Sequence, residues 1–418
     1  MIYSTIMIPY SIYLHIPFCR HRCGYCDFNT YAGLETLIVD YVHALCCELE
    51  FLAGSAGERL PVHTIFFGGG TPSLLPIPEL ERVFNTIQAA FDLLPGVEVT
   101  LEANPGTLSS EYMRELHRLG VNRLSLGMQS AQPGELLLLE RQHSYSDVVQ
   151  AVTWARKAGF DNLNLDLIFG LPHQELAAWQ NTLDLAVGLS PDHCSLYALS
   201  LEHGTPLAHA AARGLVSEPD PDLAADMYEW AAQRLNKAGF IQYEISNWAR
   251  PAGHGQILAC RHNLQYWRNQ PYLGFGAGAH GYAGGVRTIN VLAPAAYIHR
   301  LLGSTGNAQP PAGEWDAVMD RQTVPIFPCT PATVTVKSLE RSDEIGETMM
   351  MGLRLVQEGV SRSMFKERFG QDLREFFAQE IGELSRLGLL EWAGEGEERL
   401  RLTPGGRLLG NQVFMQFI

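Results

Sequence analysis

Short β-rich runs alternate with longer amphipathic stretches along residues 12 to about 200, and this alternation limits the possible folds more than any other feature of the chain. Six runs are strand candidates: YLHI, TIFFG, VEVTLEAN, NRLSLGMQ, NLNLDLIFG and HCSLYALS. Helical patterns follow them, for example LIVDYVHALCCELEFL and SYSDVVQAVTWARKAG. Strands that alternate with helices of this length predict parallel βαβ units.

The spacing of the strand candidates, about 30 to 35 residues, predicts an α/β fold with a partial (β/α)6-type barrel over residues 1–240. In such a fold the chemistry lies at the carboxyl ends of the strands. We expect residues 241–320 to pack on the barrel and to end in a Gly- and Pro-rich linker over 303–320. Residues 321–418 predict a helical, winged-helix-like domain, in which LLEWAGEGEERLRLTPGGRLL contains two short strands.

The charge balance argues against a nucleic-acid partner. The 418 residues contain 30 Lys plus Arg against 45 Asp plus Glu, so the formal net charge of −15 would repel a phosphate backbone. No apolar run approaches the roughly 18 to 20 residues that span a bilayer. The N-terminal segment has no Lys or Arg before Arg20 and therefore lacks the basic region of a signal or transit peptide. We expect a cytoplasmic protein without a membrane segment.

Three of the eight cysteines crowd into one short loop directly after the first strand candidate. They are Cys19, Cys23 and Cys26, in a C-x3-C-x2-C pattern. Three thiolates can hold three irons of a [4Fe–4S] cube and leave the fourth iron open. The alternative is a structural zinc site, for which His15 or His21 would supply the fourth ligand.

The cysteine pattern, with the aromatic Tyr25 before its last cysteine, resembles the radical S-adenosylmethionine (SAM) superfamily. Within that superfamily, YLHIPFC followed by CDF is similar to the oxygen-independent coproporphyrinogen oxidase group and especially to its HemW branch. The resemblance covers residues 12 to about 410. It implies that SAM chelates the open iron, and that an electron from a donor such as flavodoxin or ferredoxin cleaves SAM to methionine and a 5′-deoxyadenosyl radical.

Further motifs end the other strand candidates. The GGGTP sequence that begins at Gly68 either lets a ligand approach the backbone or forms a tight turn, and the residues alone leave both readings open. Glu102 ends the third strand candidate, where its carboxylate either contacts a ligand or forms an N-cap or a loop salt bridge. Gln, Arg and Asp side chains suit the hydroxyl and carboxylate groups of an adenosyl ligand. The residues that the resemblance assigns to SAM are Tyr13, Tyr25, Gly69, Gly70, Thr71, Glu102, Gln129, Arg141 and Asp166.

A later segment, RHNLQYW, resembles the H-N-x-x-Y-W motif that is associated with haem in the HemW branch. Its residues are His262, Asn263, Tyr266 and Trp267. An imidazole is a good axial ligand of haem iron, and the aromatic rings could pack on the macrocycle. The alternative is an ordinary core histidine beside aromatic residues. His280, in the Gly-rich run LGFGAGAHGY, is a second candidate ligand.

Two functions share the cluster and SAM. One is a haem chaperone that binds haem or a related porphyrin and passes haem to haem-accepting proteins. The other is an oxygen-independent coproporphyrinogen III oxidase. The oxidase pattern has a further cysteine two positions after Cys26, where this chain has Phe28, and a longer segment before the motif. These departures and the H-N-x-x-Y-W motif favour the chaperone. A structural zinc protein or a winged-helix transcription factor is the third class, and the net charge and the SAM pattern disfavour it.

Overall fold

A computed structural model describes residues 8–253, 255–303 and 326–418, and its chain divides into two compact units. The first unit contains residues 1–163, 201–217 and 271–338, and the second contains 164–200, 218–270 and 339–418. Each unit is thus built from three separate stretches of sequence. Apart from Gly303, the predicted linker over 303–320 lies outside the described residues.

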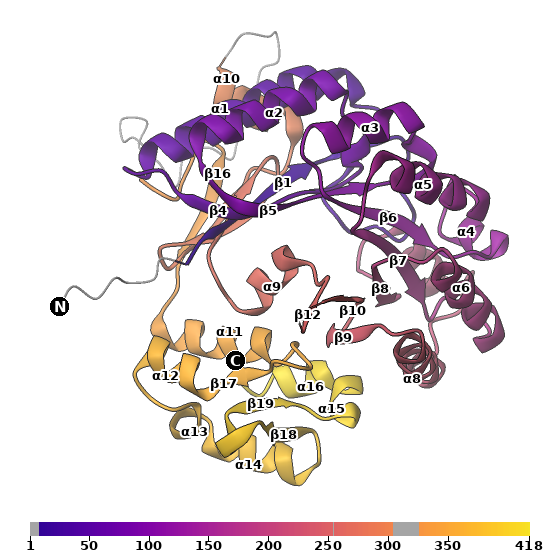
Figure 1. Ribbon diagram of the computed structural model, residues 1–418, viewed down its shortest axis with the longest axis vertical. Helices are drawn as coiled ribbons and strands as arrows, with labels where there is room; N and C mark the ends of the chain where they lie inside the picture. The colour runs from indigo at the N-terminus through magenta and orange to yellow at the C-terminus, as the bar shows by residue number, and fades with distance from the viewer. Residues whose placement is uncertain (1–7, 254, 304–325) are drawn as a thin grey trace. The chain divides into compact units, whose positions relative to one another are not determined.

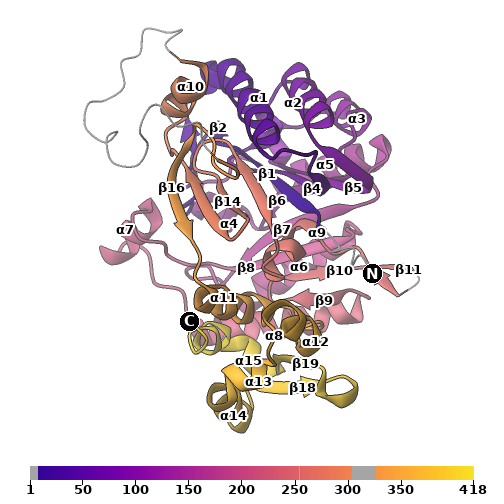
Figure 2. The ribbon, with the colours of Figure 1, turned by 90° about the vertical axis from the view of Figure 1, so that its left-hand side faces the viewer.

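The first unit is built on a mixed sheet in the order β16-β15-β14-β13-β1-β4-β5-β6. Strands β13, β1, β4, β5 and β6 pair with one another in parallel, whereas β14, β15 and β16 extend the sheet from β13 in antiparallel pairs. The bounds are β1 Tyr10–Ile16, β4 Pro61–Gly69, β5 Asp92–Ala103, β6 Arg123–Gln129, β13 Tyr272–Phe275, β14 His280–Ala283, β15 Val286–Asn290 and β16 Thr333–Ser338. Figure 2 shows β14 and β16 within this sheet.

Helices of the first unit cover the parallel strands, with α1, α2, α3 and α5 on one face (Figure 1). Their bounds are α1 Ile38–Ser55, α2 Ile77–Ala90, α3 Ser110–Arg118, α4 Pro133–Leu138, α5 Tyr145–Ala158, α7 Pro206–Ala212 and α10 Pro294–Leu302. Local signals fix their ends: α5 begins with a capping box between Ser144 and Asp147 and ends at the left-handed Gly159. The predicted order of strands and helices is confirmed here.

The second unit continues the strand and helix alternation with β7 and β8, which are parallel, and adds β10 and β9 in antiparallel pairs. The bounds are β7 Leu163–Phe169, α6 Leu176–Gly188, β8 His193–Ala198, α8 Pro221–Lys237, β9 Ile241–Glu244, β10 Asn247–Ala249 and α9 Arg261–Trp267. A two-stranded ribbon is formed by β11 Pro251–Gly253 and β12 Gln256–Ile257. With β1, β4, β5 and β6, the strands β7 and β8 complete the six strands expected for a (β/α)6 pattern.

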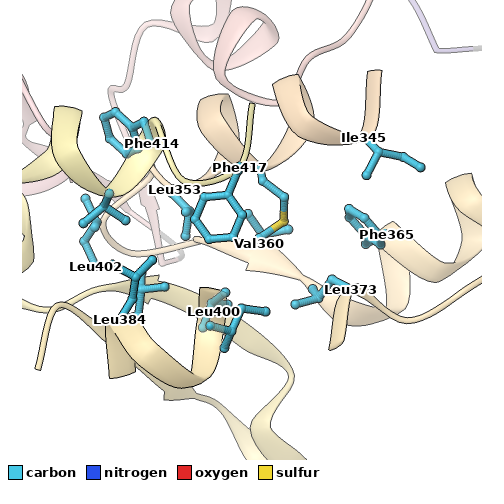
Figure 3. Packing of buried hydrophobic residues seen from close by; sticks show 14 of the residues in the cluster. Ile345, Leu353, Val360, Phe365, Leu373, Leu384, Leu400, Leu402, Phe414 and Phe417 are labelled. Carbon is cyan, nitrogen blue, oxygen red and sulfur yellow. The ribbon is translucent and has the colours of Figure 1, made fainter. Parts of the chain in front are cut away.

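The carboxyl-terminal part of the second unit is helical with a small antiparallel sheet in the order β17-β19-β18, which confirms the winged-helix-like prediction. Its elements are α11 Arg341–Gly352, β17 Val360–Ser361, α12 Arg362–Phe369, α13 Leu373–Phe376, α14 Ala378–Arg386, β18 Leu390–Ala393, β19 Arg399–Leu402, α15 Pro404–Leu408 and α16 Gly410–Phe414. Figure 3 shows the buried side chains of this core, among them Leu353, Leu400 and Phe417, converging from helices and sheet.

Among the described residues, no helix is both long and apolar enough to cross a bilayer.

Candidate functional site

The three-cysteine loop begins at the short strand β2, Phe18–Cys19, directly after β1. Strand β2 pairs in parallel with β3, Tyr31–Ala32, so two residues at each end close the loop. Inside it, the backbone N–H of Cys26 donates to the carbonyl of Cys23 at 3.1 Å. The loop is therefore a closed turn at the carboxyl end of β1. The sequence analysis predicts the functional site at this end of the strands.

His15 lies beneath this loop and holds it. Its Nε2 is 2.9 Å from the carbonyl oxygen of Asn29, which can only accept, so Nε2 carries the hydrogen. Nδ1 is then the acceptor for the hydroxyl of Tyr13 at 3.1 Å. Burial lowers the pKa of His15, which agrees with a neutral ring. Both ring nitrogens are engaged within the protein, so this histidine positions the loop and does not offer a free metal ligand.

The thiols are close enough to influence one another, and each has a polar neighbour. The hydroxyl of Thr71 donates to Cys19 Sγ at 3.6 Å, and the Arg141 guanidinium donates to Cys23 Sγ at 3.8 Å. Cys26 Sγ is 3.9 Å from the hydroxyl of Thr30. Burial raises the pKa of the Cys19 and Cys26 thiols, and the Thr71 hydrogen bond opposes this rise at Cys19. Donors aimed at sulfur favour the thiolate, the form that binds metal.

The thiols do not converge on one point. Throughout residues 8–253, 255–303 and 326–418, no three His, Cys, Asp or Glu side chains are arranged to hold a single metal ion. A [4Fe–4S] cube does not need such convergence, because each cysteine binds a different iron. His21, the other histidine considered as a fourth ligand, is 3.0 Å from the carboxylate of Glu140.

Arg141 is the buried cation of this site. Its guanidinium donates to the carbonyl of Gly127 at 3.1 Å and also hydrogen-bonds Tyr25. Burial lowers the pKa of Arg141, but the neighbouring Tyr25 and Cys23 outweigh this effect and the pKa is raised. Burial also raises the pKa of Tyr25 to about 12. The Nε of Arg141 is buried without a hydrogen-bond partner, and a buried N–H of this kind calls for an acceptor.

A cavity of about 140 Å³ opens beside Cys23 and Arg141. His143, which the sequence analysis did not single out, lies in its wall, and its Nε2 donates to the carbonyl of Met128 at 3.0 Å. Burial lowers the pKa of His143 to about 4, and its Nδ1 is buried without a donor. The remaining lining residues are Arg20, His21, Thr71, Asn104, Gly106, Thr107, Glu140 and Gln142. Two residues of the cavity wall, Arg141 and His143, thus each have a buried nitrogen without a hydrogen-bond partner.

The GGGTP turn after β4 packs tightly against other residues of the protein. Gly69 has φ +109°, and a Cβ at this position would lie 2.5 Å from the His15 ring. At Gly70 a Cβ would lie 2.7 Å from the carbonyl oxygen of Phe18. The backbone N–H of Gly69 donates to the Glu102 carboxylate at 3.1 Å, so this side chain ties β5 to the turn. These contacts show that the segment forms a tight turn, and the assignment of Gly69 and Gly70 to SAM stays a prediction.

Gln129 and Arg141 meet above Gly127. A Cβ on this glycine would lie 2.8 Å from Gln129 Nε2 and 3.0 Å from the Arg141 guanidinium. Gln129 itself has φ +62°, a conformation that is uncommon for a residue other than glycine and that costs free energy. The structure therefore brings together the cysteine loop, Thr71, Glu102, Gln129 and Arg141 within the first unit.

Asp166 and the H-N-x-x-Y-W motif belong to the second unit. Asp166 lies on β7, where its Oδ1 accepts a hydrogen bond from Asn164 Nδ2 at 2.8 Å. The four residues of the H-N-x-x-Y-W motif lie on α9, a helix of seven residues. His280 lies in the first unit, with an exposed side chain on β14; partial desolvation of its ring and the nearby charge of Arg287 lower its pKa.

The motif residues on α9 are occupied with one another and with the core. His262 is 1% exposed, and its Nε2 is 2.9 Å from the hydroxyl of Tyr266, one turn further along the helix. The Arg354 guanidinium lies 5.1 Å from the centre of the Trp267 ring. The indole N–H of Trp267 is buried without a hydrogen-bond partner. Asn263 is half-buried on the same helix.

Comparisons with known proteins show which family the chain resembles. The description "Radical SAM superfamily" matches residues 13–186, and "HemN C-terminal domain" matches residues 339–409. The chain is 36% identical to "Heme chaperone HemW" of Bacillus subtilis over 98% of this chain and 99% of that protein. It is 45% identical to the protein of that name from Mycobacterium tuberculosis H37Rv, over 71% of this chain and 75% of the relative.

The structure is similar to that of coproporphyrinogen III oxidase (HemN) from Escherichia coli, with a TM-score of 0.77 and 22% identity over 98% of this chain and 90% of that one. This likeness shows a shared fold.

Proposed function

Because the chain belongs to the HemW family of radical SAM proteins, we propose that it is a haem chaperone that carries a [4Fe–4S] cluster and SAM and delivers haem to haem-requiring proteins. The observation that carries the proposal is the cysteine loop with an unsatisfied buried donor and acceptor beside it, on Arg141 and His143. In this proposal Cys19, Cys23 and Cys26 hold three irons. The cluster would supply a one-electron redox centre with one iron open to SAM.

The two unsatisfied atoms fit the amino-acid part of SAM. Arg141 Nε can donate to the carboxylate, and His143 Nδ1 can accept from the amino group. Thr71, Glu102 and Gln129 surround the same end of the sheet as further contacts. Asp166 remains a predicted contact of the adenosyl group, and Tyr13 and Tyr25 remain predicted neighbours of the cofactor.

Haem is assigned to the H-N-x-x-Y-W segment on α9, where aromatic side chains and a histidine lie on one short helix. His262 can bind iron through Nε2 only after its contact with the Tyr266 hydroxyl is broken. His280, which is exposed on β14, is the second candidate ligand. The proposed partners are haem, an apo-haemoprotein that accepts it, and an electron donor such as flavodoxin or ferredoxin.

The test is anaerobic reconstitution of the cluster followed by three assays on one sample. We expect haem to bind in a titration followed by absorbance, and the bound haem to pass to an apo-haemoprotein. With SAM and a reductant, coproporphyrinogen III should give no protoporphyrinogen above background. Multiple-turnover conversion of coproporphyrinogen III would overturn the chaperone proposal and favour the oxidase.

A further inference from the structure

A chain of hydrogen bonds in the second unit connects Asp166 with the beginning of helix α9. Asn164 Nδ2 is 2.8 Å from Asp166 Oδ1, and Asn164 Oδ1 is 2.7 Å from His193 Nδ1. His193 Nε2 is 2.9 Å from the hydroxyl of Tyr243. The same hydroxyl oxygen is 3.3 Å from the backbone N of Cys260, the residue that caps α9. Of the residues on this path, only Asp166 was a candidate from the sequence.

The direction of every bond in the chain follows from its acceptor end. A carboxylate can only accept, so the amide nitrogen of Asn164 donates to Asp166 and the amide oxygen accepts from His193 Nδ1. In the neutral tautomer that carries its hydrogen on Nδ1, His193 Nε2 accepts the hydrogen bond of the Tyr243 hydroxyl. The Tyr243 oxygen accepts from the Cys260 N–H. All of these donors therefore point along the path toward Asp166, an arrangement in which each bond polarises the next.

The path is enclosed by protein. His193 is 0% exposed, Asn164 2% and Tyr243 4%. Asn164 and Asp166 lie two residues apart on β7, so their side chains share a face, and Asn164 is paired with His193 in the β7–β8 ladder. Water has little access to such a site, so a change at one link alters a hydrogen bond inside the protein and affects its neighbours along the path.

We propose that His193 is a positioning residue through which an adenosyl ligand at Asp166 and haem at α9 change each other's affinity. The inference rests on the proposed function, because it takes Asp166 as a contact of the adenosyl ligand and α9 as the haem segment. A ligand that hydrogen-bonds the Asp166 carboxylate alters the acceptor at one end of the path. The Cys260 N–H at the other end belongs to the helix that carries His262 and Tyr266. By thermodynamic linkage the effect on the two affinities is reciprocal.

The experiment measures the haem dissociation constant of the reconstituted protein with and without saturating S-adenosylhomocysteine, a stable probe of the SAM site. In the wild type we expect the two constants to differ about fivefold or more, the lower end of typical coupling between sites. In Tyr243→Phe and His193→Phe the ratio should fall to about one. Ser195→Ala is the matched control: Ser195 donates to the same Asn164 oxygen at 3.1 Å but lies off the path, so the coupling should persist.

A second measurement does not depend on haem. Amide hydrogen exchange over Cys260–Leu264 should change when S-adenosylhomocysteine binds to the wild type, and should not change in Tyr243→Phe. If both ligands bind but the haem constant is the same with and without the probe, the coupling is wrong and the proposed function stands. Retention of the full ratio in Tyr243→Phe also overturns it. Failure of the wild type to bind either ligand would instead reject the proposed function itself.

Discussion

The cysteine loop of the first unit and helix α9 of the second unit carry the two most specific motifs of the chain, and they differ in how their side chains are engaged. Each thiol of the loop has weak polar neighbours, and two residues of the adjoining cavity wall each have a buried nitrogen without a hydrogen-bond partner. On α9, by contrast, His262 is buried and already bonded to Tyr266. The loop offers ligands directly, whereas the helix must give up an internal contact before His262 Nε2 can bind iron.

The largest expected effect is on the loop. Replacement of Cys19, Cys23 or Cys26 by Ala should abolish the cluster, since each thiolate is assigned to a different iron. Iron and sulfide analysis of the reconstituted protein measures this, and some haem binding should remain because α9 is unchanged. Cys47→Ala, on helix α1, is the control and should leave the iron content unchanged. A normal cluster in Cys23→Ala would show that the ligand assignment is wrong.

The next prediction concerns the titration of Glu244, whose neighbour Arg354 packs on Trp267 of α9. Burial raises the pKa of Glu244 to about 7, while Arg354, which also packs on Trp267, opposes the rise. The folded state therefore binds this proton more tightly than the unfolded state, whose Glu titrates near pH 4.3. The free energy of unfolding should fall as the pH rises from about 4.5 to about 7, by about 3 kcal/mol, and then level off.

Denaturant unfolding at a series of pH values measures this dependence. Glu244→Gln, which cannot titrate, should flatten the profile over the same range. An equally steep decrease in that variant would assign the dependence to another group.

The smallest effect separates the two readings of His262. Tyr266→Phe removes the hydroxyl that occupies His262 Nε2, a hydrogen bond of net worth about 1 kcal/mol. If Nε2 binds haem iron, the haem dissociation constant should fall about fivefold, since a competitor has been removed. His262→Ala should raise the constant. If both variants bind haem as the wild type does, His262 is not the ligand, and His280→Ala becomes the variant to test.

Local patterns predicted the elements of the fold well, because hydrophobic periodicity reports which face of a segment is buried. All six predicted strands are present, as are α1 and α5, the helices of the two quoted helical patterns. The strand β17 was not predicted, since two residues are too short to show a period. The expected domain ranges 1–240, 241–320 and 321–418 stay a prediction. The compact units join stretches that are distant in sequence, and such joining leaves no local signal.

The site was predictable where function depends on neighbours in sequence and not where it depends on contacts across the fold. The C-x3-C-x2-C spacing located the loop, but nothing local pairs His15 with Asn29 or leaves His143 Nδ1 without a donor. One local signal was available and not used. His262 and Tyr266 are four residues apart, the spacing at which side chains on a helix touch, so their contact could have been predicted.

Glu48 shows a different kind of signal. It stands among leucines on the buried face of α1, and a carboxylate at such a position needs several donors. The structure supplies four, from the backbone of Gly276 and the side chains of Asn290, Tyr297 and Thr330. The need could be predicted from the sequence, but the donors lie more than 220 residues away and could not be identified.

The tight packing of the GGGTP turn bears on how mutational tolerance is interpreted. A side chain at Gly70 would collide with the carbonyl oxygen of Phe18, and one at Gly69 with the His15 ring, before any cofactor is present. A library of substitutions selected only for folded protein would therefore already reject changes at both positions. Intolerance there measures the fit of the turn against the first strands and is not by itself a sign of ligand binding.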